Sequence, residues 1–287
     1  MSRWKSLHFF IHDYNKINEL LSFLNANLAP EIKSELFFIR YWLGGPHIRI
    51  RFKNEQHEPA IRKALVTYWD KNHFISSLNA GEYYKNYQRY FAADEQICWY
   101  ENGHVEEIAY EPELTRYGGE NGIAHCEAFF CWDTRNILDA LNTCSGRLEQ
   151  LLFGYCLVFH EVAKELQLEA SKLLNLEGLN VESEVSFVTN KVSEKYVQHR
   201  TIYQGYVGQY EAQQLYPQHL TPLKNELNKL SKSLSGMAGS ELIEVFNSIL
   251  HMSFNRAGIA PFKEAVIRHF SFLALNDQGE VDAILAS

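Results

Sequence analysis

The sequence predicts an α+β fold, with a mostly antiparallel sheet and a β-hairpin in the first half, packed with helices that dominate the second half. Three observations favour this class. Strand-like alternation is concentrated before residue 53, the turn signal Gly44-Gly45-Pro46 separates two such segments, and helical periodicity prevails after Gly119. No repeat, linker or low-complexity tract interrupts the chain, so we expect a single domain over residues 1–287.

The opening of the chain predicts a strand, a helix, a hairpin and a second helix. Apolar residues at helical spacing follow the first strand, and a proline ends that run. Glycine supplies the positive φ that a tight hairpin turn needs. The expected elements are a strand at 4–12, a helix at 15–28 before Pro30, hairpin strands at 35–43 and 47–52, and an amphipathic helix from Pro59 to Trp69.

The remaining elements follow from breaks in periodicity. Residues 82–117 lack helical spacing and contain Gly103 and Pro112, which indicates further strands and a loop. A long helical stretch follows from Gly119 and is broken near Ser145-Gly146. Later helices are expected at 190–206, at 240–252 behind a Ser240 N-cap, and at 261–274 with Pro261 in its first turn.

Composition and charge exclude several classes of protein. The chain has 287 residues, 46% hydrophobic and 22% charged, as in ordinary globular proteins. A net charge of −8 argues against a broad basic surface for nucleic acid. No apolar run is long enough for a signal peptide or a membrane span, so we expect a cytoplasmic protein.

The cysteines do not indicate a disulfide framework or a metal site. There are five of them and no Cys-x-x-Cys pair, so we expect reduced, buried thiols. His125, Cys126 and Cys131 lie in a helical stretch whose spacing matches no zinc pattern, and they are interpreted as core.

The second hairpin strand carries the first candidate site. Alternation places His47, Arg49 and Arg51 on one face and apolar residues on the other. A two-residue turn at Gly44-Gly45 would pair Arg40 with Arg49 and put three arginines on one face. Because arginine binds carboxylates through a planar fork, this face suggests an anion site. The alternative is a solvated polar face whose arginine stems cover aromatic rings.

Two further segments carry polar chemistry. Glu113 precedes Arg116 by three residues, just before Tyr117 and two glycines, although the spacing matches no phosphate-binding loop and a plain Gly-rich turn is the alternative. His251 and Asn255 lie at i and i+4 of a helix, where a core histidine is the alternative to a base. The acids Glu106, Glu107, Glu111 and Glu113 could suggest a glycosidase, but the sequence does not give the carboxylate separation that this chemistry demands, and we expect them to form exposed strand faces. Gly-x-Ser-x-Gly is absent, which disfavours a serine hydrolase.

Read together, these segments resemble the C-terminal elimination domain of lantibiotic dehydratases. The likeness includes the Trp4 to His8 strand and the Cys126-Glu-Ala-Phe-Phe segment, so it spans nearly the whole chain. Full-length dehydratases of this kind carry a large N-terminal domain that transfers glutamate from glutamyl-tRNA, and no such domain is expected here. The resemblance is to stand-alone forms, including the elimination proteins and pyridine-forming cyclases of thiopeptide pathways.

What the resemblance implies is β-elimination of glutamate from glutamylated Ser or Thr, which yields dehydroalanine or dehydrobutyrine. By this likeness, Arg49 or Arg51 together with Arg116 would clamp glutamate. His251 would move the proton, and Glu113 would orient an arginine or the base. The residues expected to bind substrate are Arg40, His47, Tyr117 and Asn255. No metal, flavin or nucleotide cofactor is expected.

The resemblance also implies partners and alternatives. The partners would be a glutamylated, ribosomally made precursor peptide and a separate protein that glutamylates it with glutamyl-tRNA, with no direct binding of nucleic acid. One alternative is a pyridine-forming [4+2] cyclase. Another is a noncatalytic partner of a modification complex, which could capture a peptide by strand addition.

Overall fold

The computed structural model describes residues 4–85, 98–144, 146–174 and 185–277 and confirms the α+β class. The chain forms two compact units. One contains Met1–Pro112 with Phe130–Asn142, and the other contains Glu113–Phe129 with Thr143–Ser287. The expectation of a single domain over 1–287 stays a prediction. None of the helices in the described ranges is long and apolar enough to cross a membrane.

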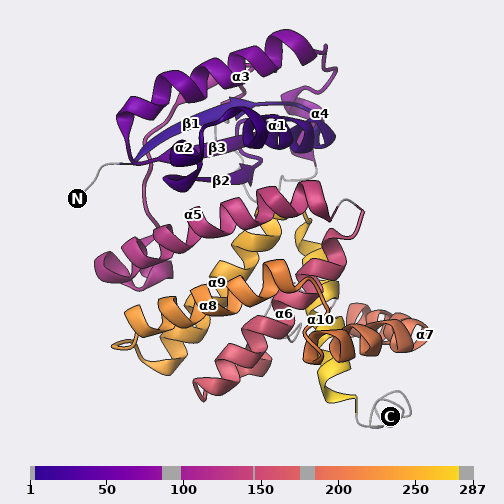
Figure 1. Cartoon of the computed structure of the whole chain (residues 1–287). Helices are drawn as coiled ribbons and strands as arrows, with labels where there is room; N and C mark the ends of the chain where they lie inside the picture. The colour runs from indigo at the N-terminus through magenta and orange to yellow at the C-terminus, as the bar shows by residue number, and fades with distance from the viewer. Residues whose placement is uncertain (1–3, 86–97, 145, 175–184, 278–287) are drawn as a thin grey trace. The chain divides into compact units, whose positions relative to one another are not determined.

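The first unit is built on a four-stranded antiparallel sheet with the order β2-β3-β1-β4. Figure 1 labels three of its strands, β1, β3 and β2, which lie side by side. The predicted hairpin is confirmed, since β2 pairs with β3 throughout, and β3 and β1 are the central strands while β2 lies at one edge. The strands are β1 (Lys5–Phe10), β2 (Leu36–Tyr41), β3 (His47–Phe52) and β4 (Val105–Glu107).

One face of this sheet packs against helices and forms the core of the first unit. Leu7, Phe9, Ile48 and Ile50 bury their side chains against α1 and α3, as strand alternation requires. The helices of this unit are α1 (Tyr14–Asn27), α2 (Pro30–Ser34), α3 (Glu58–Asn72) and α4 (Ala80–Tyr84). The predicted helix at 15–28 is confirmed as α1, which begins after the Asp13 cap.

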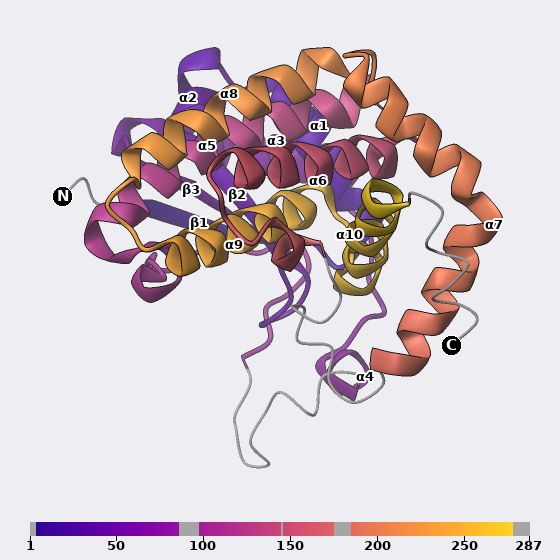
Figure 2. The same cartoon turned by 90° about the horizontal axis from the view of Figure 1, so that it is seen from below.

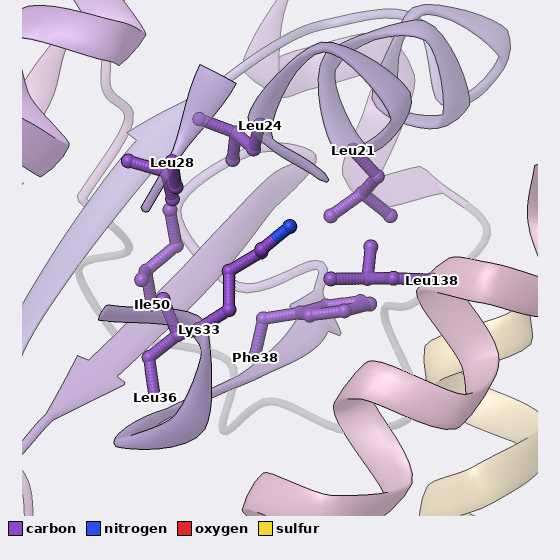
Figure 3. A pocket seen from close by; sticks show the side chains of 8 residues that line it. All are labelled: Leu21, Leu24, Leu28, Lys33, Leu36, Phe38, Ile50 and Leu138. Carbon is purple, nitrogen blue, oxygen red and sulfur yellow. The ribbon is translucent and has the colours of Figure 1, made fainter. Parts of the chain in front are cut away.

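Part of α5 (Gly119–Thr143) completes this core. Figure 3 shows Leu138 facing Leu21 and Phe38 around a small cavity of about 10 Å³. α5 also provides a hydrogen-bond partner for the backbone of the edge strand β2, because the Phe38 N–H donates to Thr134 Oγ1 at 3.4 Å. Covering an edge strand in this way removes a template for unwanted pairing.

The hairpin connection differs from the two-residue turn that the sequence suggests. Tyr41 pairs with His47, so the connection runs from Trp42 to Pro46. Gly44 and Gly45 adopt φ values of +95° and +108°, which residues with a Cβ atom rarely adopt. A longer connection shifts the register by one residue, and such a shift moves every side chain of one strand to the opposite face.

The second unit is helical, with α6 at its centre. In Figure 2, α6 lies between α8 and α9, and it also packs against α7 and α10. Eleven of its residues are buried, which explains why its apolar pattern is nearly continuous. The helices are α6 (Leu148–Glu165), α7 (Val185–Glu211), α8 (Pro217–Ser233), α9 (Gly239–Ala257) and α10 (Pro261–Asn276).

The predicted helices at 190–206, 240–252 and 261–274 are confirmed as parts of α7, α9 and α10. The predicted Ser240 cap is wrong, because α9 begins one residue earlier and Ala238 occupies the cap position. Glu241 reaches back to accept the Ala238 N–H at 3.4 Å, which satisfies the backbone donor of the cap residue from inside the first turn.

Predictions for residues 82–117 are confirmed in part. β4 is a strand, but Glu111 and Glu113 lie outside it, and α4 overlaps the beginning of this segment. Residues 86–97 lie outside the described ranges. Four of the cysteines are buried as expected, whereas Cys98 is exposed. The interpretation of His125 as a core residue is wrong, because it lies on the exposed face of its helix.

Candidate functional site

The first group of candidate residues lies on the sheet face opposite the helical core. His47, Arg49 and Arg51 share this face of β3, as predicted. Arg40 does not join them, because it pairs with Ile48 instead of Arg49. Arg40 is buried on the other face, where it donates to Asn18 Oδ1 at 2.7 Å. The one-residue shift of the hairpin register therefore overturns the prediction of three arginines on one face.

His47 is a fixed acceptor for Arg49. Its Nδ1–H donates to the Gly45 carbonyl at 2.7 Å, and Arg49 Nε donates to His47 Nε2 at 3.2 Å. Arginine has no acceptor, so Nε2 must carry the lone pair and the ring must be neutral. Burial, opposed by the Gly45 bond and assisted by Arg49, lowers the pKa of His47 to about 3. His47 thus orients Arg49 and does not supply a proton near neutral pH.

Both arginines of this face lie over aromatic rings. The Arg49 guanidinium sits 3.4 Å from the centroid of Tyr41, and that of Arg51 sits 4.3 Å from Tyr110. Cation–π contact stabilises half-buried guanidinium groups and holds their planes in place. The alternative interpretation of this strand is a solvated polar face whose arginines cover aromatic rings. The contacts with Tyr41 and Tyr110 agree with the second part of it, but the face is not solvated, because Arg49 and Arg51 are half-buried.

His8 is a member of this face that the site prediction missed. It pairs with Arg49 across β1 and β3, and its ring stacks on His47 with centroids 5.0 Å apart. Burial, reinforced by Arg49, lowers the pKa of His8 to about 2. His8 ends the Trp4 to His8 strand that resembles the family, and it takes part in the alternation of β1. Neither signal assigns it to this face until the β1 to β3 register is known.

The buried neutral His47 makes stability depend on pH. The unfolded chain takes up a proton on this histidine below about pH 6.5, whereas the folded protein does so only near its lowered pKa. Its stabilising contribution is therefore complete above about pH 6.5 and is lost as the pH falls. As the pH falls below about 6, we expect the parent to lose about 1.4 kcal/mol more unfolding free energy per pH unit than His47→Gln loses.

Urea unfolding at several pH values between about 7 and 5 measures this slope. The exposed His73→Gln is the matched control and should keep the parental slope. Equal slopes for His47→Gln and the parent would contradict the assignment of a neutral folded-state His47.

The second group of candidate residues lies in the helical unit. A short 3₁₀ turn, η3 (Leu114–Tyr117), carries Arg116 against α9. Arg116 Nε donates to Ser248 Oγ at 3.0 Å, and its Nη1 donates to Glu113 Oε2 at 3.0 Å. Gly118 then turns the chain into α5 with φ of +80°, where a Cβ would lie 2.8 Å from Met237. The sequence pattern Glu113 to Gly119 thus presents one guanidinium beside α9.

His251 lies on the same face of α9 as Ser248, one turn further along. Its Nδ1 lies 2.7 Å from Oε2 of Glu264, a buried carboxylate of α10. The His251 side chain is 36% exposed, so its ring is held by a buried carboxylate on one side and is accessible to solvent on the other. The interpretation of a buried core histidine is therefore wrong. Sequence reasoning missed Ser248 and Glu264.

An open pocket of about 550 Å³ adjoins Arg116. Its walls come from η3, from Gly119 at the start of α5, and from α9, which contributes Glu244 and Ser248 among others. The volume suits a group of amino-acid size, and the guanidinium offers such a group a carboxylate-binding fork.

The other predicted substrate-binding residues of this unit differ in accessibility. Tyr117 is buried, and burial raises the pKa of its phenol to about 12, which makes it a poor base near neutral pH. Asn255 is half-buried one turn beyond His251 on α9. Among the residues that the structure describes, no three His, Cys, Asp or Glu side chains are grouped so as to hold a metal ion.

Comparison with solved structures shows which known folds the chain shares. It is similar to the pyridine synthase TbtD from thiomuracin biosynthesis, with a TM-score of 0.76 and 15% identity over 96% of this chain and 98% of that chain. It is also similar to TsrL, with a TM-score of 0.66 and 15% identity over 100% and 99% of the two chains. At this identity the likeness establishes the fold alone.

Sequence comparison establishes the family. No curated protein matches the chain significantly. Residues 4–275 match the family described as the C-terminal part of the lantibiotic biosynthesis dehydratase. This match covers nearly the whole chain and confirms the resemblance seen in its sequence segments. The chain therefore belongs to the lantibiotic biosynthesis dehydratase C-terminal family.

Proposed function

We propose that this chain catalyses β-elimination of glutamate from glutamylated Ser or Thr in a ribosomally made precursor peptide. The observation that carries the proposal is the placement of a half-exposed imidazole and a guanidinium along one face of α9, where Arg116 bonds Ser248 one turn before His251. Elimination needs a base near a carbon acid and a cation near the leaving carboxylate, and this face offers both.

In the proposed step, His251 takes the α-proton of the glutamylated residue. The electron pair of the Cα–H bond forms the Cα=Cβ double bond, and the Cβ–O bond breaks. Glutamate leaves with that oxygen as a carboxylate, and the proton remains on the imidazole until solvent removes it. No electrons enter or leave, so the products are glutamate and a dehydroamino acid.

Arg116 is proposed to hold a carboxylate of the glutamyl group. Its present partner Glu113 is 62% exposed, and exposed ion pairs contribute only about 0–1 kcal/mol. A substrate carboxylate can therefore replace Glu113 at little cost, while Ser248 continues to hold Nε. Glu113 would keep the guanidinium oriented before substrate arrives.

Arg49 and Arg51 are proposed to bind further carboxylate groups of the substrate. His47 and the ring of Tyr41 fix the Arg49 plane, which reduces the conformational entropy lost on binding. The glutamylated precursor peptide is the proposed partner, and a separate glutamyl-tRNA-dependent protein would supply it.

Pyridine-forming cyclisation is the second candidate, because the chain shares its fold with the pyridine synthase TbtD. Elimination is favoured because an imidazole and a guanidinium, groups that can serve as its base and as a carboxylate-binding group, lie along α9. Two parallel incubations distinguish the candidates: one with a glutamylated peptide and one with a peptide that carries two dehydroalanines. Conversion of the second peptide alone would favour the cyclase, and binding of both without conversion would favour a noncatalytic partner.

We expect elimination to proceed without metal, flavin or nucleotide, because an activated ester requires only a base, a cation and a positioned leaving group. Chelator-treated and desalted protein should release glutamate at the parental rate, as followed by mass spectrometry. A rate that recovers only after a metal ion or cofactor is restored would contradict this expectation.

A further inference from the structure

We infer that Glu264 and Arg268 are positioning residues that hold the proton of His251 on Nδ1 and leave Nε2 as the proton acceptor. The kinetic part of this inference rests on the proposed elimination. The tautomer that it assigns to His251 does not, and it can be measured without any substrate.

The geometry of the Glu264 carboxylate carries the inference. Its Oε2 lies 2.7 Å from His251 Nδ1, and its Oε1 accepts from Arg268 Nη2. An ionised carboxylate accepts hydrogen bonds and cannot donate one, so Nδ1 must carry the hydrogen of the neutral imidazole. The lone pair is then on Nε2, the nitrogen that does not bond Glu264. Glu264 is only 3% exposed, so it acts on chemistry through His251.

Arg268 fixes the position of this carboxylate. Its guanidinium is fully buried and donates to Asn247 Oδ1 and to the Leu173 carbonyl, in addition to Glu264. Nearby Cys156 adds no competing charge, because burial raises the pKa of its thiol to about 12. The buried charges of Glu264 and Arg268 therefore balance each other. The hydrogen bond from Arg268 holds the carboxylate in the orientation that presents Oε2 to His251.

Stability alone does not explain this buried pair. Replacing a buried ion pair with apolar residues of similar volume is often neutral or stabilising. A carboxylate placed between a buried arginine and a half-exposed histidine has a use that apolar residues cannot supply, because it selects one imidazole tautomer and stabilises the imidazolium that forms during proton transfer.

Glu264→Gln tests the inference sharply. Arg268 will continue to donate to the amide oxygen, which turns the amide NH₂ toward His251 Nδ1. A donor at this position forces the hydrogen of the neutral ring onto Nε2, the nitrogen that must accept the substrate proton. We expect kcat for elimination to fall about 10²- to 10⁴-fold with little change in KM, since an Asp-to-Asn change that reverses the histidine tautomer of a serine protease costs about 10⁴-fold.

The direct readout is the ¹⁵N spectrum of the imidazole nitrogens of His251, assigned by its loss in His251→Ala. In the neutral form of the ring, the parent should show protonation on Nδ1, and Glu264→Gln should show protonation on Nε2. Glu169→Gln is the control, because Glu169 is an exposed acid paired with Lys172 and should leave both tautomer and rate unchanged.

A double variant, Glu264→Leu with Arg268→Met, covers the case in which the single variant unfolds, since it removes both buried charges together. It should also lose Nδ1 protonation and elimination. Retention of Nδ1 protonation in either folded variant would overturn the inference, as would a parental kcat. A parent that shows the expected tautomer but eliminates nothing would refute the proposed function and leave the positioning role intact.

Discussion

His251→Ala is expected to slow elimination about 10²- to 10⁴-fold, because general acid–base catalysis by a positioned side chain contributes an effect of this size. The glutamylated peptide should still bind, since the groups proposed to hold carboxylates remain. Single-turnover release of glutamate measures the chemical step, and a fluorescence or calorimetric titration measures binding. Binding and chemistry should therefore separate in this variant.

The control for His251→Ala is His73→Ala, a change at an exposed histidine outside the proposed machinery. Circular dichroism and the midpoint of urea unfolding establish that both variants are folded. A folded His251→Ala protein with parental turnover would show that the base is another residue.

Arg116→Lys is expected to reduce kcat/KM for elimination by about 10- to 10²-fold although it preserves the charge. Lysine cannot bond Ser248 and a substrate carboxylate through one planar fork, and a hydrogen bond to a charged group is worth about 1.5–3 kcal/mol. Glutamylated peptide should accumulate in the assay. Arg49→Lys should act in the same direction, because an ammonium cannot reproduce the contacts with His47 and Tyr41.

Arg62→Lys provides the matched control for both arginine changes. Arg62 pairs with Glu58 on the surface of α3, so its replacement should leave turnover unchanged. Parental kcat/KM in both folded Lys variants, Arg116→Lys and Arg49→Lys, would show that neither guanidinium binds a carboxylate of the substrate.

In the hairpin, strand alternation predicts which residues of one strand share a face, but not which residues of the neighbouring strand join them. Alternation alone correctly grouped His47, Arg49 and Arg51, because residues two apart on one strand always share a face. The position of Arg40 depends on the length of the turn between two strands, and Gly44-Gly45 fits more than one length. The local pattern therefore predicted which residues of β3 share a face, but it placed Arg40 of β2 on the wrong face.

The helical unit shows a different limit. The periodicity of α9 and the proline at the start of α10 identified both helices, because these signals are local. Glu264 became a partner of His251 only through the packing of α10 against α9. A Glu and an Arg at i and i+4, as Glu264 and Arg268 are, usually indicate an exposed helix face, and burial gives this pair its different meaning.

The fold class could be predicted because the strands of the described residues lie in the first half of the chain and long amphipathic helices dominate the second half. The family could be predicted because its polar residues occur in short segments that keep their order. The site roles of Ser248 and His8 could not be predicted in this way, since each becomes part of a site only through a neighbour from another element.

The most direct test of the proposed elimination is one assay with the purified chain and a peptide glutamylated at a single serine. Mass spectrometry of the peptide and quantification of free glutamate give the stoichiometry of the reaction. Elimination predicts one glutamate released for each dehydroalanine formed, and no reversion of the peptide to serine. A peptide that stays glutamylated, or that loses glutamate by hydrolysis and returns to serine, would contradict the account.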